Sequence, residues 1–251
     1  MNLVIKYGGN AMNDDATRRA VAAALGGLAG GEVPPVVVHG GGPFIQAALD
    51  AAGLEHRFVR GLRVTTPESL AVIEQVLTVL GKSLAQEIGA AVGLTGRDAE
   101  LLRATPREPD LGRVGRMAHV NVRALAALRA AGLVPVVGCL ALAPDGGLLN
   151  VNADEVAGAV AGALGEGVVF LTNVPGVLDD PADPGSLLAE LTRDEALARI
   201  ADGRVAGGMI PKVEAALAAL DQGAPFALIA DGRDPAGVAR ALAGGGTRVV
   251  A

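Results

Sequence analysis

The feature that most constrains the fold is a repeated alternation of short apolar runs and alanine-rich helical stretches. The runs at 2–6 (NLVIK) and 35–38 (PVVV) are too short for helices and show no polar alternation. Strands of this kind are buried on both faces, which is typical of parallel sheets covered by helices on either side. The sequence therefore predicts an α/β fold, a three-layer αβα sandwich around a mostly parallel, open central sheet.

The alternation continues along nearly the whole chain. Helices are expected at 14–30, 43–53, 67–90, 121–131, 153–164, 193–202, 208–221 and 235–242. Strands are expected at 2–6, 35–38, 91–96, 133–137, 167–173, 225–229 and 247–250. Hairpins are expected at 55–66, between 99–104 and 113–121, and around a turn at 145–147. No linker separates independent domains, so we expect two lobes on one continuous sheet, residues 1–145 and 146–251.

Composition excludes several classes of protein. With 51% hydrophobic and 19% charged residues, the chain has ample material for a core and is not expected to be disordered. A net charge of −6 and the lack of a basic run argue against nucleic-acid binding. The single cysteine, Cys139, excludes an internal disulfide and suits a reducing cytoplasm. No membrane-span-length apolar segment and no export signal is found, so a cytoplasmic protein without a membrane partner is expected.

Three consecutive glycines end the second apolar run, in "VVVHGGGPFIQAAL". Such a stretch fits either a phosphate cradle of backbone N–H groups at a helix N-terminus or the oxyanion hole of an esterase. The esterase needs a nucleophile elbow followed by a histidine, but all three histidines lie in the first half and none of the three serines lies in a G-x-S-x-G motif. The cradle remains. His39 itself is expected to be structural rather than catalytic.

The two common nucleotide fingerprints, G-x-x-x-x-G-K-[ST] and G-x-G-x-x-G, do not occur. Instead, six short motifs stand mainly at the ends of expected strands: "KYGGN" (6–10), "HGGGP" (39–43), "GLRVT" (61–65), "NVNAD" (150–154), "LTNVPGVL" (171–178) and "GGMIPK" (207–212). In this order and spacing, they resemble the amino-acid kinase family. The resemblance extends from Lys6 to the closing "GTRVV" at 246–250.

The resemblance implies a reaction and its cofactors. In such kinases ATP gives its γ-phosphoryl group to a carboxylate, and the motifs look most like members that phosphorylate the side chain of N-acetyl-L-glutamate in arginine biosynthesis. Mg²⁺ is expected to be held mainly by the phosphates and water, so no protein metal ligand is expected. The N-terminal lobe is expected to bind the acyl-amino acid and to dimerise, and the C-terminal lobe to bind ATP.

Residue roles follow only from the matched motifs. The expected catalytic residues are Lys6 and Lys212, two of only three lysines in the chain, with Asp154 holding them in place. The expected substrate-binding residues are Gly41, Gly42, Arg63 and Asn150, the last two on the substrate's α-carboxylate. The expected nucleotide-binding residues are Gly8, Gly9, Thr172, Asn173, Val174, Gly176 and Val177.

Two alternatives and one expectation about assembly remain. Either the acceptor is α-aminoadipate or glutamate attached to a carrier protein, or the chain is a non-catalytic nucleotide or amino-acid sensor of the same fold. The first strand begins at residue 2, which leaves no room for the extra N-terminal helix of arginine-regulated members. We therefore expect a homodimer, formed through helix 67–90 or a neighbour, that is insensitive to arginine.

Overall fold

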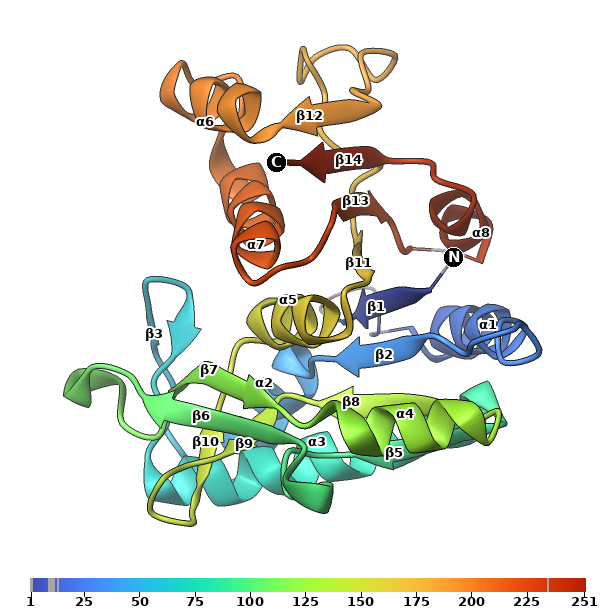
Figure 1. Cartoon of the computed structure of the whole chain (residues 1–251). Coiled ribbons are helices and arrows are strands. Elements are labelled where there is room, and N and C mark those ends of the chain that lie inside the picture. Colours follow the sequence, from blue (N-terminus) through green and yellow to red (C-terminus); the bar gives the residue numbers. More distant parts are fainter. Residues whose placement is uncertain (1, 9–11, 13, 234) are drawn as a thin grey trace.

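A computed structural model describes residues 2–8, 12, 14–233 and 235–251 and is built around one eight-stranded sheet (Figure 1). In spatial order its strands are β12 (Glu190–Thr192), β14 (Thr247–Val250), β13 (Ala227–Asp231), β11 (Gly167–Thr172), β1 (Leu3–Tyr7), β2 (Val36–His39), β8 (Val134–Gly138) and β5 (Ala91–Leu94). Neighbouring strands from β13 to β5 pair in parallel, whereas β14 runs antiparallel to β13. The predicted α/β sandwich around a mostly parallel open sheet is confirmed.

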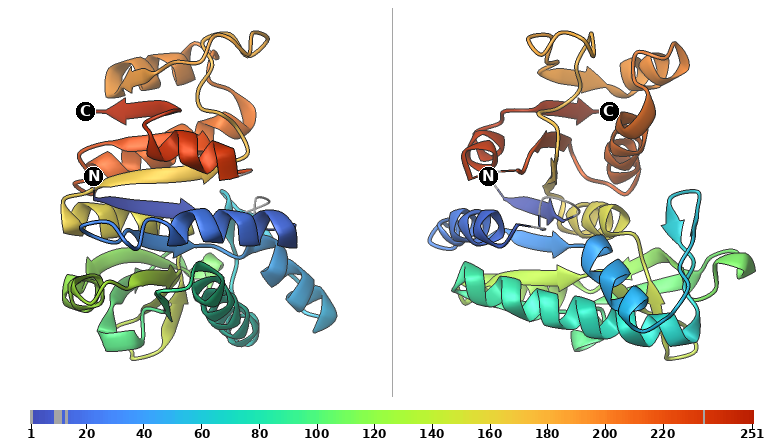
Figure 2. Two further views of the ribbon diagram at one scale, coloured as in Figure 1. Left: turned by 90° about the vertical axis from the view of Figure 1, so that its right-hand side faces the viewer. Right: turned by 180° about the vertical axis from the view of Figure 1, so that it is seen from behind.

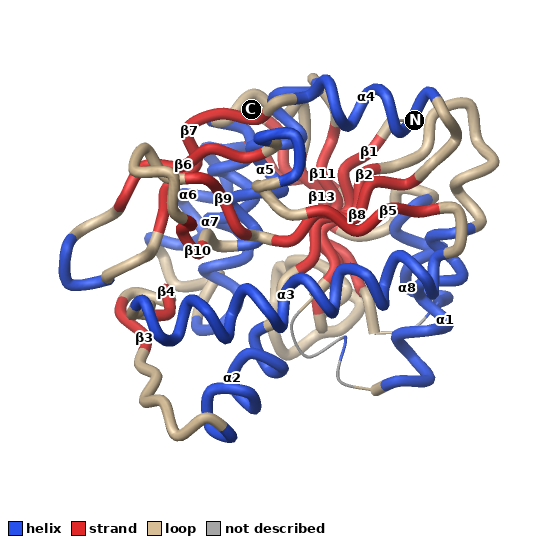
Figure 3. Tube along the Cα trace, turned by 90° about the horizontal axis from the view of Figure 1, so that it is seen from below, coloured by secondary structure: helices blue, strands red, loops and turns tan. Residues whose placement is uncertain are grey.

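Helices cover both faces of this sheet (Figure 3). One layer contains α1 (Asp15–Gly26), α3 (Pro67–Ile88) and α8 (Pro235–Leu242), and the other contains α4 (Val122–Ala130), α5 (Ala153–Leu164) and α7 (Ile210–Asp221). β1 shows why two layers are needed: Val4 packs in one hydrophobic cluster, while Leu3, Ile5 and Tyr7 pack in the other. An uninterrupted apolar strand places alternate side chains on opposite faces, so both must be covered.

Two smaller sheets extend from the half of the molecule that contains β5 and β8. One consists of β6 (Leu102–Pro106), β7 (Gly115–Val120), β9 (Leu140–Leu142) and β10 (Leu148–Asn150), and the other is the hairpin of β3 (Phe58–Val59) and β4 (Leu62–Arg63). Figure 2 shows the β3–β4 hairpin projecting beyond the body of the molecule. The three expected hairpins are therefore present. β10 follows the expected lobe boundary at 145 but pairs with β9, which precedes it.

The expected elements differ from the structure mainly at their ends. The first helix ends at Gly26 rather than at residue 30, and Gly26 packs so closely on α3 that a Cβ there would lie 2.3 Å from the Ile88 carbonyl oxygen. The seventh begins as a 3₁₀ turn at Gly207–Met209 before α7. β12 was not expected, since only three residues form it. Among the described residues no helix is both long and apolar enough to span a membrane.

Candidate active site

The loops that follow β1 and β2 meet at the carboxyl edge of the main sheet. The two strands pair in parallel, with Lys6 opposite Val38 and Tyr7 opposite His39, so both loops leave the sheet side by side. The Gly40 amide donates to the carbonyl oxygen of Tyr7 at 3.3 Å. A Cβ at Gly8 would lie only 3.0 Å from the Gly40 nitrogen, so this approach requires glycine. Ligands of open parallel sheets bind at this edge.

The three glycines of the triplet differ in how closely other atoms approach them. The left-handed backbone that favours glycine occurs at other described glycines but not at 40–42. A Cβ on Gly41 would press on Leu77 at 3.1 Å, which is a packing reason, whereas a Cβ on Gly42 would meet nothing within 4 Å. α2 (Gly42–Ala51) starts here, and its N-cap residue Gly41 provides no side-chain cap. The first N–H groups of α2, apart from Pro43, which has none, therefore have no side-chain cap and suit an anion.

Lys6 and Asp154, which are far apart in the sequence, form an ion pair at the end of β1. The Nζ–Oδ1 distance is 2.9 Å, and the lysine side chain is only 16% exposed. α5 positions the carboxylate, because its N-cap Asn152 accepts a hydrogen bond from the Asp154 amide at 2.7 Å. A buried ammonium needs such a partner. The sequence reasoning paired these two residues, and they lie together.

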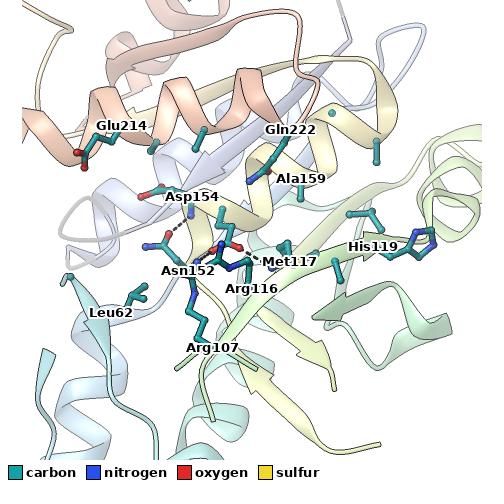
Figure 4. A pocket seen from close by; sticks show the side chains of 18 of the residues that line it. Leu62, Arg107, Arg116, Met117, His119, Asn152, Asp154, Ala159, Glu214 and Gln222 are labelled. Atoms are coloured by element: carbon teal, nitrogen blue, oxygen red, sulfur yellow. Dashed lines mark hydrogen bonds and ion pairs between the residues drawn. The ribbon is translucent and has the colours of Figure 1, made fainter. Parts of the chain in front are cut away.

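Lys212 lies on α7, which faces the same region from the other half of the sheet. Its Nζ donates to the carbonyl oxygen of Gly208 at 2.9 Å, and no ion pair among the described residues joins it to Asp154. A pocket of about 1100 Å³ is nevertheless bordered by Asp154 and by the neighbours of Lys212 on α7, Pro211 and Glu214 (Figure 4). The role of Lys212 as a second catalytic lysine stays a prediction.

Arg63, at the end of the β3–β4 hairpin, is a buried cation without a carboxylate partner among the described residues. The residue is 8% exposed, Nη2 donates to the Gly42 carbonyl oxygen at 3.2 Å, and the guanidinium lies 4.6 Å from the centre of the Phe58 ring. Nη1 is buried and has no hydrogen-bond partner in the described part of the chain. Burial lowers the pKa of Arg63, and the Asp50 charge opposes this only in part. A guanidinium with a free buried donor is well suited to bind an anion.

Asn150, the other expected carboxylate ligand, lies next to the hairpin. Its side-chain Nδ2 donates to the hydroxyl of Thr65 at 3.2 Å, and Thr65 in turn donates to the carbonyl oxygen of Arg63 at 2.9 Å. The two residues are thus joined through one buried hydroxyl, which sequence reasoning did not single out. The only available signal was that threonine closes the "GLRVT" motif.

Five of the expected nucleotide-binding residues lie at the end of β11 and on the loop that follows it: Thr172, Asn173, Val174, Gly176 and Val177. The Thr172 hydroxyl donates to the Val174 carbonyl oxygen at 3.1 Å, and the Val177 amide donates to the hydroxyl of Thr247 at 2.8 Å. Gly176 has φ +151°, and a Cβ there would lie 2.6 Å from that hydroxyl. The loop is therefore held against β14 while Asn173 is exposed. Gly9 lies outside the described residues.

His39 is fully buried at the end of β2. Burial lowers its pKa to about 4, so the imidazole is neutral at pH 7. Nδ1 lies 3.2 Å from the Gly40 carbonyl oxygen, whereas Nε2 is enclosed by Gly81 and Gly138, where a Cβ would lie 2.8 and 3.2 Å away. This packing fits the structural role expected from the sequence.

Comparison with known proteins identifies the family. The amino acid kinase family profile matches residues 1–231. The chain belongs to the amino acid kinase family. Acetylglutamate kinase of Deinococcus radiodurans is 58% identical over 249 residues, which cover 99% of this chain and 100% of that protein. Acetylglutamate kinase of Thermus thermophilus is 47% identical, covering 97% of this chain and 95% of the relative.

Solved structures share the fold of this chain. The structure of smu.665 from Streptococcus mutans has a TM-score of 0.76 at 26% identity and covers 99% of this chain and 98% of its own. An N-acetylglutamate synthase from Neisseria gonorrhoeae, solved with coenzyme A and N-acetyl-glutamate, gives a TM-score of 0.84 at 24% identity; the match covers all of this chain and 59% of the synthase. The resemblance to amino acid kinases inferred from the six motifs is confirmed, whereas the roles of individual residues stay predictions.

A further pair beside the predicted site was missed by the sequence reasoning. Glu155 follows Asp154 in the first turn of α5, and its Oε2 accepts from Arg107 Nη2 at 2.6 Å while Oε1 accepts from the Met117 amide at 2.7 Å. The helix turn that carries Asp154 is thereby fixed to the β6–β7 hairpin (Figure 4). The only indication of Glu155 in the sequence was that a second acidic residue directly follows Asp154.

Proposed function

We propose that this chain transfers the γ-phosphoryl group of ATP to the side-chain carboxylate of N-acetyl-L-glutamate, producing an acyl phosphate for arginine biosynthesis. Relatives named acetylglutamate kinase, matched over nearly their whole length, support this assignment. The structural observation that carries it is Arg63, a buried guanidinium whose Nη1 has no partner among the described residues. An α-carboxylate is the anion that this geometry suits, because guanidinium and carboxylate can pair bidentately.

The proposed chemistry needs no general base. The acceptor carboxylate is already ionised at neutral pH, so catalysis consists of positioning and of stabilising charge on the transferred group. Lys6 supplies a cation next to the glycine loops, and Asp154 orients it through their 2.9 Å ion pair. Lys212 would supply the second cation from α7 once its Nζ leaves the Gly208 carbonyl oxygen for a phosphate oxygen. A compact ammonium suits a phosphoryl oxygen as a point charge.

The glycine loops fit the phosphates of ATP. A Cβ at Gly8 would lie only 3.0 Å from the Gly40 nitrogen, so the two loops approach each other closely, and a Cβ at Gly42, where α2 starts, would meet nothing within 4 Å. Thr172, Asn173, Gly176 and Val177 would border the nucleoside. Mg²⁺ would neutralise the phosphates and be held mainly by them and by water; no group of three or more His, Cys, Asp or Glu in the described chain is placed to hold a metal.

The alternatives receive less support. The relatives reported above are named for the free acetylated amino acid, not for a carrier-bound one. A non-catalytic sensor would not need both motif lysines, and Lys6 is paired as the catalytic scheme requires. A cytoplasmic location, where ATP and amino-acid precursors meet, suits this reaction.

The test is an assay of ADP release with N-acetyl-L-glutamate, free L-glutamate and carrier-bound α-aminoadipate in parallel. We expect turnover with the first and little with the other two. Activity on the carrier-bound substrate alone would replace the acceptor but keep the chemistry. No ADP release with any of the three would favour the sensor.

The proposed homodimer would use the exposed side of α3. Val79 is 65% exposed there, and together with Phe44, Val76 and Leu80 it borders an apolar groove of about 460 Å³ next to Arg18. An apolar helix face of this kind is suited to a second copy of the same chain. Val79→Asp should shift the mass measured by light scattering from dimer to monomer, whereas Val33→Asp, at another exposed valine, should not.

A further inference from the structure

Thr65 is buried between the two residues proposed to hold the substrate's α-carboxylate. Its exposed fraction is 0%. The hydroxyl donates to the Arg63 carbonyl oxygen at 2.9 Å and accepts from Asn150 Nδ2 at 3.2 Å. Neither contact is explained by the phosphoryl-transfer scheme, in which Thr65 has no part.

The backbone holds Thr65 and Asn150 on two sides of one short segment. The Thr65 amide donates to the Leu111 carbonyl oxygen at 3.0 Å, and its own carbonyl oxygen accepts from the Arg113 amide at 2.7 Å. The Asn150 amide donates to the Arg113 carbonyl oxygen at 2.9 Å. At Gly112 a Cβ would lie 2.4 Å from the Thr65 carbonyl oxygen, so glycine permits this close packing. The distance between the two side chains is therefore set by main-chain hydrogen bonds.

The hydroxyl also decides which way the Asn150 amide faces. A hydroxyl has a single hydrogen to donate, and in Thr65 that hydrogen is used by the Arg63 carbonyl oxygen. Toward Asn150 the hydroxyl can then only accept, so Asn150 must present its NH₂ group and not its oxygen. The NH₂ group has two hydrogens, and the second remains available for a ligand. A carboxylate needs donors, so this amide orientation is the one that can bind it.

We propose that Thr65 is a positioning residue of the α-carboxylate site, whose hydroxyl fixes the Asn150 amide as a donor and ties it to Arg63. This inference rests on the proposed function, because the α-carboxylate is that of the proposed substrate. Thr65 acts before substrate arrives: it prevents the amide from turning its oxygen toward an incoming anion. The role predicts an effect on substrate affinity rather than on the phosphoryl transfer itself.

The test compares Thr65→Val, which keeps the shape but removes the hydroxyl, with Thr65→Ser, which keeps the hydroxyl. Thr65→Val should raise the KM for N-acetyl-L-glutamate about tenfold while kcat and the KM for ATP stay within about twofold. Thr65→Ser should restore the KM to within about threefold of the parent. In an Asn150→Ala background, Thr65→Val should have little further effect, because the amide it orients is gone.

The same variants distinguish this inference from the proposed function. If the unmodified protein releases no ADP with N-acetyl-L-glutamate, the proposed function fails, and the ¹⁵N side-chain amide resonances of Asn150, assigned by their loss in Asn150→Ala, still report on Thr65. They should shift in Thr65→Val and remain in place in Thr65→Ser. Unmoved resonances in Thr65→Val overturn the inference, as does a KM effect that is equally large with and without Asn150.

Discussion

Two arginines in this molecule are equally buried and have opposite surroundings. Arg63 and Arg129 are each 8% exposed. Arg129 Nε donates to the Pro34 carbonyl oxygen at 2.6 Å, and its Nη atoms donate to both carboxylate oxygens of Glu166 at 2.8 and 3.2 Å. Within the described chain, the Arg63 side chain makes one hydrogen bond, to the Gly42 carbonyl oxygen, and its buried Nη1 has no partner.

Position in the fold explains the difference. Pro34 precedes β2 and Glu166 precedes β11, so Arg129 closes the amino edge of the main sheet. Arg63 lies beside Gly42, just after the carboxyl end of β2. Equal burial of the same side chain therefore does not imply an equal role. A buried cation with a complete set of partners has no donor left for a ligand, and removing it leaves its partner unpaired, whereas one with an empty donor indicates a ligand.

The prediction with the largest expected effect concerns Lys6 and Lys212, the two cations proposed to act at the carboxyl edge of the main sheet. Lys212→Met, and separately Lys6→Met, should lower kcat by at least about 10⁴-fold, because each removes a charge that acts on the transferred phosphoryl group. Both proteins should remain folded. Steady-state kinetics and thermal unfolding measure the two effects. The matched control is Lys82→Met, since Lys82 is the third lysine and donates to the Gly93 carbonyl oxygen on β5 at 2.6 Å.

Lys82→Met should keep near-normal turnover. Equal loss in all three variants would mean that lysine removal harms the protein in general. Full activity in Lys212→Met would end the two-lysine mechanism.

The prediction with the second-largest effect concerns the stability of the protein when Arg129, at the amino edge of the main sheet, is replaced. Arg129→Met leaves Glu166 buried without its partner and should lower the free energy of unfolding by about 3–5 kcal/mol. The double variant Arg129→Met/Glu166→Leu should recover most of that loss, because no unpaired charge remains. Urea unfolding measures both. Activity per folded molecule should not change in either variant, and a selective loss of activity would contradict a purely structural role.

This contrast also indicates what the sequence could and could not reveal. The main sheet was predictable because apolar runs repeat the same local pattern, and Lys6 and Asp154 were predictable because each belongs to a matched motif. The Arg129–Glu166 pair was not, since its partners are 37 residues apart and neither lies in a motif. Thr65 was missed although it lies in a matched motif, because its proposed role depends not only on Arg63, two residues away, but also on Asn150, 85 residues away.

β12 and Gly41 show two further limits. Three residues, Glu190–Thr192, form β12, and a strand this short gains its order from pairing with β14 rather than from an apolar run. Gly41 was expected to bind the substrate, and the structure adds a packing reason for glycine there, since a Cβ would lie only 3.1 Å from Leu77. Packing against a helix that is distant in the sequence cannot be inferred from the residues next to Gly41.

The third effect addresses Arg63 directly. Arg63→Met should raise the KM for N-acetyl-L-glutamate about 100-fold, the equivalent of about 2.7 kcal/mol, because it removes a desolvated charge that pairs with a carboxylate. Stability should not fall, since no buried anion is left behind. A matched comparison is Arg60→Met: Arg60 lies in the same hairpin, and its side chain is 66% exposed. A loss of stability like that of Arg129→Met would show that Arg63 supports the fold instead.

The smallest effect concerns a third kind of arginine, paired but exposed. Arg113 donates to Asp145 at 2.7 Å, and the aspartate side chain is 60% exposed. The hydrogen bond from Arg113, followed by the Gly147 amide, lowers the pKa of Asp145 to about 2. Because the pKa is lower in the folded state, the unfolded chain binds a proton first as the pH falls. The contribution of Asp145 is therefore complete above about pH 4 and is lost as the pH falls toward about 2.

Asp145→Asn should accordingly lower the unfolding temperature by no more than about 2 °C at pH 7, because water screens an exposed pair. The difference between parent and variant should shrink between pH 4 and pH 2, where the parent aspartate takes up its own proton. Other carboxylates titrate in the same range, so only this difference, measured by calorimetry at matched pH, isolates Asp145. A difference as large as that of Arg129→Met would mean that pairing alone, and not burial, sets the contribution of an arginine here.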